Sequence, residues 1–110
     1  MKREFISTSW FDRAWEDIGL TDEDRRRLEN ALQDNPKIGD LMEGTGGLRK
    51  MRFAFEHQGK SGSTKVCYVD MVIKEKIVFV DVFVKKDKEN LTKAERNELK
   101  KIVKLIIKEV

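Results

Sequence analysis

Basic side chains in the middle of the chain are the residues whose types and spacing could do chemistry. They fall in three stretches: Arg49, Lys50 and Arg52; Lys60 and Lys65; and Lys85 and Lys86. Fixed cations of this kind can hold the phosphates of a nucleic acid, or stabilise negative charge that develops on a phosphate during cleavage. Ordinary solvated lysines are the alternative, and charge alone does not decide between the two.

The formal charge is large and nearly balanced, with 23 Lys+Arg against 20 Asp+Glu in 110 residues. Residues 1–35 carry six basic and nine acidic side chains, residues 36–88 carry eleven and seven, and residues 89–110 carry six and four. The basic excess therefore lies in the middle of the chain, which favours a surface there that faces a polyanion.

Composition favours one folded domain over residues 1–110. Hydrophobic residues make up 39% of the chain and come in patterned runs, which excludes a disordered protein. A single cysteine, Cys67, excludes an internal disulfide framework and a cysteine-rich metal site. The acidic, amphipathic start at residues 1–5 is unlike a signal peptide, and no apolar stretch reaches membrane-spanning length. We expect a soluble cytoplasmic protein.

Two other kinds of site have weaker support. Residues 54–61 match a relaxed P-loop pattern, but a β-branched strand follows where the P-loop needs a helix. Cys67 and His57 could form a thiol–imidazole pair, yet Cys67 lies among apolar strand residues and is better explained as part of the core. One histidine without further ligands does not make a metal site.

Hydrophobic periodicity predicts the element order β-α-α-β-β-β-α, an α+β fold with a small, mostly antiparallel sheet. The expected strands are residues 2–8, 50–55, 65–73 and 77–84, and the expected helices are residues 10–18, 21–35 and 92–110. Thr8 or Ser9 is expected to cap the first helix and Gly19 to end it, while Thr92 and Glu95 form a capping box for the last helix.

The pairing of the last two strands depends on the turn between them. If Glu75 and Lys76 form a two-residue turn, Asp70 lies directly opposite Asp81. A slip by one residue would instead place Asp81 opposite Val69.

Two opposed aspartates repel and require cations nearby. We expect Lys50 and Arg52 on the preceding strand to neutralise Asp70 and Asp81. A glycosidase-like pair of carboxylates is the alternative interpretation, and the structural role is favoured over it.

Three segments together resemble a known family. They are Gly-Gly-Leu-Arg-Lys-Met-Arg at residues 46–52, Gly-Lys-Ser-Gly-Ser-Thr-Lys-Val-Cys-Tyr at residues 59–68, and Val-Phe-Val-Lys-Lys-Asp at residues 82–87. With these segments the chain resembles the HigB-type branch of the RelE superfamily of type II toxins, from about Phe5 to Leu105. The resemblance implies a RelE-like fold with two N-terminal helices and one C-terminal helix.

The chain departs from the family pattern at four positions, one of which is Asp87 in place of a glutamate. Ser63 replaces a glycine, Lys65 replaces the catalytic arginine, and Phe83 replaces a tyrosine, whereas Lys85 is kept. Lysine keeps the charge of arginine but loses its bidentate fork. By strict alternation Lys65 and Lys85 fall on opposite faces of the sheet, so the family site requires a bulge or twist to bring them together.

The resemblance implies a ribosome-dependent endoribonuclease that cleaves translated mRNA without a metal or cofactor, by attack of the 2′-hydroxyl on the adjacent phosphate. The implied catalytic residues are Lys65, Lys85 and Arg52, and the implied RNA-binding residues are Arg49, Lys50, Lys60, Tyr68 and Lys86. The implied partners are the ribosome, mRNA and a cognate helix-turn-helix antitoxin, with operator DNA reached only through that antitoxin and no membrane involved.

Two alternatives to this enzyme stay open. The chain could be a weakened toxin-like module that binds antitoxin or RNA without cleavage, while a gyrase-poisoning relative is less favoured because it lacks the basic block. In the last helix Leu105 and Ile107 lie off the main apolar stripe. They could bind an antitoxin segment, or the N-terminal strand and helix could cover them.

Overall fold

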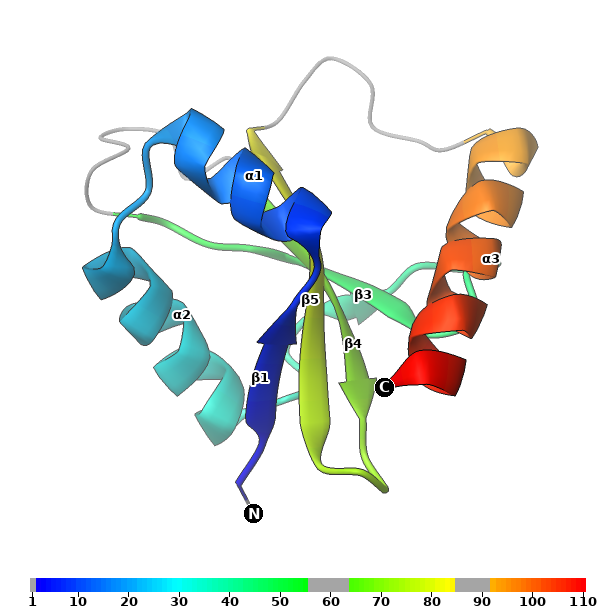
Figure 1. The fold of residues 1–110 in the computed structure, drawn as a ribbon, viewed down its shortest axis with the longest axis horizontal. Helices are drawn as coiled ribbons and strands as arrows, with labels where there is room; N and C mark the ends of the chain where they lie inside the picture. Colours follow the sequence, from blue (N-terminus) through cyan, green and yellow to red (C-terminus); the bar gives the residue numbers. More distant parts are fainter. Residues whose placement is uncertain (1, 56–63, 85–91) are drawn as a thin grey trace.

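A five-stranded sheet carries helices on both faces (Figure 1). The structure, a computed structural model, describes residues 2–55, 64–84 and 92–110. The strands are β1 (Glu4–Ser7), β2 (Asp40–Leu41), β3 (Leu48–Arg52), β4 (Thr64–Met71) and β5 (Lys76–Val84); the helices are α1 (Ser9–Ile18), α2 (Asp22–Asp34) and α3 (Lys93–Glu109). The sheet order is β1-β5-β4-β3-β2, in which β1 runs parallel to β5 and the other pairs are antiparallel. The predicted α+β class and element order are confirmed, and the short strand β2 is added to them.

Local signals set the helix ends where the sequence predicts them. Thr8 caps α1, and Gly19 ends it with a backbone φ of 91°, a left-handed conformation that glycine adopts without steric cost. Thr21 opens α2 through a capping box, and Thr92 and Glu95 form the predicted capping box of α3.

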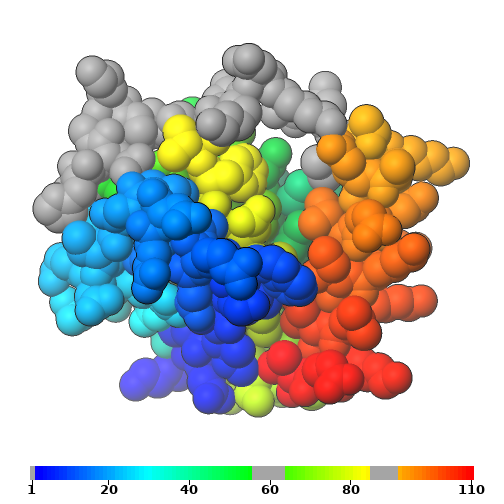
Figure 2. All heavy atoms as spheres, turned by 45° about the horizontal axis from the view of Figure 1, so that its top comes forward, coloured from blue at the N-terminus to red at the C-terminus, as the bar shows by residue number. Residues whose placement is uncertain are grey.

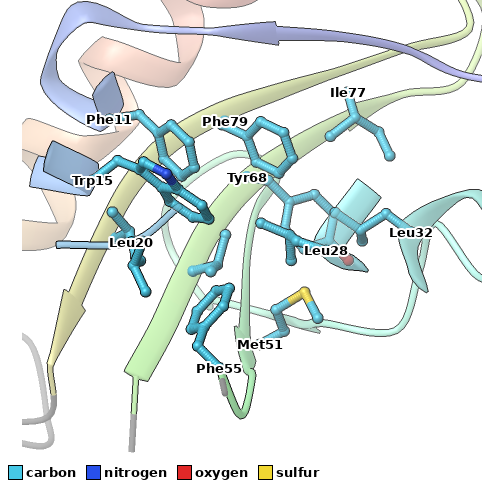
Figure 3. Close-up of a cluster of buried hydrophobic side chains, with 12 residues drawn as sticks. Phe11, Trp15, Leu20, Leu28, Leu32, Met51, Phe55, Tyr68, Ile77 and Phe79 are labelled. Atoms are coloured by element: carbon cyan, nitrogen blue, oxygen red, sulfur yellow. The ribbon is translucent and has the colours of Figure 1, made fainter. Parts of the chain in front are cut away.

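One core lies between the sheet and helices α1 and α2 (Figure 3). Its aromatic centre stacks Phe11 of α1 on Phe79 of β5, with ring centroids 4.7 Å apart, and Trp15 meets Phe55 edge-on. The buried residues of this core are Phe11, Trp15, Leu20, Leu28, Leu32, Met51, Phe55, Val66, Tyr68, Ile77, Phe79 and Val82.

A second core lies between the other face of the sheet and α3. Val103 and Ile106 are buried there with Leu48, Cys67 and residues of β4 and β5, and Leu99, Ile102 and Val110 pack at the margin. The apolar stripe predicted for the last helix is thereby confirmed. The side chains off that stripe stay uncovered: Leu105 is 59% exposed and Ile107 is 45% exposed.

The register predicted for the last hairpin is wrong. Four residues, 72–75, join β4 to β5, and Glu75 takes a positive φ of 57° where a two-residue turn was expected. Asp70 therefore lies opposite Ile77, and Asp81 lies opposite Cys67. Neither the expected pairing nor the one-residue slip occurs, because the connection at residues 72–75 shifts the register near the turn by four positions, and a β-bulge between Cys67 and Tyr68 changes it by one position further along.

Candidate nucleic-acid interface

Three cations of the predicted site share one face of the sheet. On β3, Lys50 lies opposite Cys67 and Arg52 lies opposite Lys65 of β4. Directly opposed residues of an antiparallel pair point to the same side, so Lys50, Arg52 and Lys65 all point to the face on which α3 packs. Arg52 is exposed, and the other two are half-buried.

A β-bulge in β5 determines which of its residues join this face. Cys67 pairs with Asp81 while the next residue, Tyr68, pairs with Phe79, so Val80 is the extra residue on β5. Beyond the bulge, Phe83 lies opposite Lys65 and shares its face. The sequence predicts that a bulge or twist is needed to bring Lys65 and the end of β5 to one face, and the structure has a bulge there. Lys85 itself lies outside the described residues, as do Lys60 and Lys86.

Cys67 lies on the same face of the sheet as Lys50 and Lys65. Burial raises the pKa of the Cys67 thiol to about 12, the charge of Asp81 acts in the same direction, and the charges of Lys50 and Lys65 act against it. The thiol is therefore protonated at neutral pH and is no nucleophile. Cys67 is the small core residue that the sequence indicates, with the two ammonium groups within electrostatic range of its sulfur.

Two residues predicted to bind RNA point to the opposite face. Arg49 lies opposite Tyr68, and its Nη1 donates a hydrogen bond to the Gly39 carbonyl oxygen at 2.7 Å. Tyr68 is fully buried; its hydroxyl accepts from the Gly39 N–H at 2.9 Å and donates to the Pro36 carbonyl oxygen at 2.8 Å. The RNA contact predicted for Tyr68 is corrected accordingly: this phenol holds the loop before β2 onto the sheet.

The cations that neutralise Asp70 also differ from those expected. Its carboxylate, 2% exposed, pairs with the Arg3 guanidinium at 2.7 Å and with the Lys37 ammonium at 3.1 Å. Burial alone would raise the pKa of Asp70, but hydrogen bonds from Arg3 and Lys37, together with their charges, hold it below its usual value. Lys50 and Arg52 point to the other face, so the sequence prediction that they neutralise Asp70 is wrong.

The carboxylate-pair interpretation also fails on this geometry. Asp70 is two residues from Tyr68 on β4 and therefore points to the same face, toward α1 and α2. Asp81 lies opposite Cys67 and points to the other face, toward α3, so the two carboxylates lie on opposite sides of the sheet. They cannot flank one bond of a bound sugar.

Helix α3 brings two cations that the sequence analysis did not single out. A Cβ built on Gly44 would lie 3.4 Å from Cδ of Arg96, and one built on Gly46 would lie 3.7 Å from Cγ of Lys100. Both basic side chains thus lie along the glycine-rich loop that leads into β3. Their spacing of four residues on one helix face was the signal available in the sequence.

Within the described ranges, no group of three or more acidic, histidine or cysteine side chains could hold a metal ion. Among the helices described, none is long and apolar enough to cross a membrane. The stretch from Thr64 onward is a strand, so the helix that a P-loop requires after its glycines is replaced by β4.

Comparison with known proteins places this fold among the toxins of toxin–antitoxin systems. Residues 3–109 match the family model described as the RelE toxin of the RelE/RelB toxin–antitoxin system, so the chain belongs to the RelE toxin family. A solved structure of the E. coli toxin RelE in the free state, with two arginines replaced by alanine, is 16% identical and covers 100% of each chain at a TM-score of 0.51. That likeness supports the fold. Family membership also implies an antitoxin partner.

Proposed function

We propose that this toxin is a ribosome-dependent endoribonuclease that cleaves translated mRNA. The observation that carries the proposal is the convergence of Lys50, Arg52 and Lys65 on one face of the sheet, at the level of the bulge. A row of one exposed and two half-buried cations on a rigid strand pair suits a phosphate backbone, because the charges are held in place before the substrate arrives.

The proposed reaction needs neither metal nor cofactor. The 2′-hydroxyl oxygen of one nucleotide forms a bond to the adjacent phosphorus, and the bond from phosphorus to the 5′-oxygen of the next nucleotide breaks. Lys65 and Arg52 would stabilise the additional negative charge on the phosphate oxygens in the transition state. Lys85, retained from the sequence pattern, would move a proton to or from a reacting oxygen.

The remaining cations would hold the substrate and the ribosome. Lys50 is proposed to bind the RNA backbone from the same face as Lys65, and Lys60 and Lys86 keep this role on sequence grounds. Arg49 is a weaker candidate, because its guanidinium is engaged with the Gly39 carbonyl. We further propose a cytoplasmic toxin of the HigB type, neutralised by a helix-turn-helix antitoxin that alone contacts operator DNA.

The products of the reaction test this proposal. Purified chain added to translating ribosomes should cut the mRNA and leave a 2′,3′-cyclic phosphate upstream and a 5′-hydroxyl downstream. Induced expression should arrest growth, and the double variant Lys65→Ala with Lys85→Ala should relieve that arrest. Fragments ending in a 3′-hydroxyl and a 5′-phosphate would contradict the mechanism, and full toxicity of the double variant would contradict the site.

One observation favours a catalytically weakened binding module as the second candidate. Phe83 lies opposite Lys65 on the proposed site face, where the family pattern has a tyrosine and an arginine. A phenyl ring cannot donate a hydrogen bond, and lysine cannot bind a phosphate through two parallel hydrogen bonds.

Restoring both groups discriminates between the two candidates. If the chain is a weakened enzyme, Lys65→Arg combined with Phe83→Tyr should increase mRNA cleavage on ribosomes by about tenfold or more, the scale of one charge-assisted hydrogen bond. If this variant still binds the ribosome but does not cleave mRNA, the result would favour the pure binding module.

A further inference from the structure

The glycine-rich loop at residues 42–47 runs beside α3 before the chain enters β3 (Figure 1). Gly44 and Gly46 have positive φ angles of 82° and 81°, which glycine adopts without steric cost, and both are exposed. Thr45 between them is fully buried. Its hydroxyl donates to a main-chain carbonyl of the loop at 2.6 Å and accepts from the first N–H of β3 at 3.2 Å. One internal side chain therefore holds the turn in place.

The loop leaves main-chain donors unused. In the described part of the chain, the N–H groups of Gly44, Gly46 and Gly47 donate no hydrogen bond to a protein acceptor, whereas the N–H of Thr45 does. Because glycine has no side chain, a ligand can approach these N–H groups closely. Main-chain N–H groups in such turns can bind an anion.

Two cations of α3 lie along the same loop. The Arg96 side chain passes Gly44, with its Cδ 3.4 Å from the position of an added Cβ, and the Lys100 side chain passes Gly46, with its Cγ 3.7 Å from such a position. Arg96 is half-buried and Lys100 is exposed. A guanidinium and an ammonium group are thereby added to the unused N–H groups of the loop.

The charges of these two cations are not compensated by nearby carboxylates. Within the described ranges, neither Arg96 nor Lys100 forms an ion pair, whereas the next residue of the helix, Lys101, contacts Glu98 at 3.7 Å. The acidic side chain of the loop, Glu43, is exposed and pairs with neither cation. This side of α3 therefore favours an anionic ligand.

The loop leads directly to the face of the proposed nuclease. Leu48, the first residue of β3, is buried in the core under α3, and Lys50 points to the same face two residues later. Gly46 precedes Lys50 by four residues, so their Cα atoms are at most about 14 Å apart. Figure 2 shows green atoms of the β3 segment between the yellow end of β5 and the orange half of α3. An extended RNA strand held at Lys50 can span this distance with a few nucleotides.

We propose that the loop at residues 44–47, together with Arg96 and Lys100, binds one phosphate of the mRNA backbone a few nucleotides from the phosphate that is cleaved. The guanidinium and the ammonium group pair with its oxygens, and the glycine N–H groups donate to them. This subsite holds the substrate strand and takes no part in bond breaking. The inference rests on the proposed function, since it assigns the subsite to the mRNA that the nuclease would cleave.

The test measures binding of the full chain to ribosomes programmed with an mRNA that it cannot cleave. A 2′-deoxy nucleotide at the reacting position removes the attacking hydroxyl, and an uncharged methylphosphonate linkage is moved along the strand one position at a time. We expect one linkage, a few nucleotides from the reacting position, at which neutralisation weakens binding of the wild type about tenfold or more, the scale of a charge-assisted hydrogen bond.

A double variant and a matched control assign that effect to the two cations. Arg96→Ala combined with Lys100→Ala should weaken binding to the unmodified strand by a similar factor and should abolish the effect of that linkage. Its plot of log affinity against log salt should be less steep by about 0.7, the value for one phosphate of a single strand. Lys101→Ala combined with Lys108→Ala removes two exposed charges from the same helix and should keep the linkage effect. Thermal melting verifies that each variant folds.

The outcomes separate this inference from the proposed nuclease. The inference is overturned if the wild type has no sensitive linkage, or if the control loses the linkage effect as fully as the double variant does. A double variant that binds more weakly but keeps the full linkage effect also overturns it, because the two cations would then contact the ribosome. Either result leaves the nuclease standing if ordinary mRNA is cut. A linkage effect that only the double variant abolishes, in a chain that leaves ordinary mRNA uncut, supports the inference and contradicts the nuclease.

Discussion

Replacing Asp70 with alanine is expected to lower the free energy of unfolding by about 3–5 kcal/mol, the usual effect of removing one partner from a buried ion pair. The Asp70 side chain is 2% exposed and that of Arg3 is 6% exposed, so the substitution removes the Asp70 carboxylate from a buried ion pair. A small domain has about 5–15 kcal/mol of stability in total, so this variant should unfold at a much lower urea concentration.

The same site makes stability depend on pH in a definite direction. Because the folded protein holds the pKa of Asp70 below its usual value, the unfolded chain binds a proton more readily than the folded one. The stabilisation is therefore present above the unfolded pKa, near 4, and is lost as the pH falls through the folded pKa. Urea titrations at pH 7 and at about pH 3 should show an acid-induced loss in the wild type that is smaller in Asp70→Asn.

A matched control separates the buried pair from its exposed neighbour. Lys37 contacts the same carboxylate at 3.1 Å, but its side chain is 56% exposed. Lys37→Ala should therefore cost only about 0–1 kcal/mol, as solvent-exposed ion pairs usually do. Equal losses in Lys37→Ala and Asp70→Ala would contradict the assignment of the stabilisation to Arg3 and Asp70.

Sequence alone was sufficient for the elements whose signals are local. The capping residues Thr8, Thr21 and Thr92 act on backbone groups within three residues, and each helix begins where its cap predicts. The periodicity of β4 and β5 likewise indicates the strands themselves. Strand β2, only two residues long, has no periodicity to detect and emerges only through its pairing with β3.

The register and the partners of Asp70 depend on contacts far apart in the chain. Arg3 is 67 residues from Asp70, and Lys37 is 33 residues away, so no local pattern indicates either pair. Strict alternation places Lys65 and Lys85 on opposite faces, so the family site requires a bulge in one strand. The sequence does not indicate that this bulge lies at Val80. Tyr68 matches a family motif, so the sequence predicts an RNA contact. The structure shows that the side chain is buried and that its hydroxyl is hydrogen-bonded to the main chain of Pro36 and Gly39.

Lys65→Ala is expected to lower the rate of mRNA cleavage on ribosomes by about 10²–10³-fold, the usual effect of removing one group that stabilises transition-state charge. The substitution removes a half-buried cation that lies opposite both Arg52 and Phe83 at the centre of the proposed site. Single-turnover cleavage with saturating chain measures this effect without the contribution of substrate binding.

Two further variants test whether position, rather than total charge, matters. Lys74→Ala removes the same charge from the exposed 72–75 turn at the far end of the β4–β5 pair, and it should leave the cleavage rate unchanged. Lys50→Ala, on the site face but two residue pairs further along β3, should weaken binding of the ribosome–mRNA complex more than it slows the chemical step. A similar small loss in all three variants would show that the cations act only through net charge, and would contradict a catalytic role for Lys65.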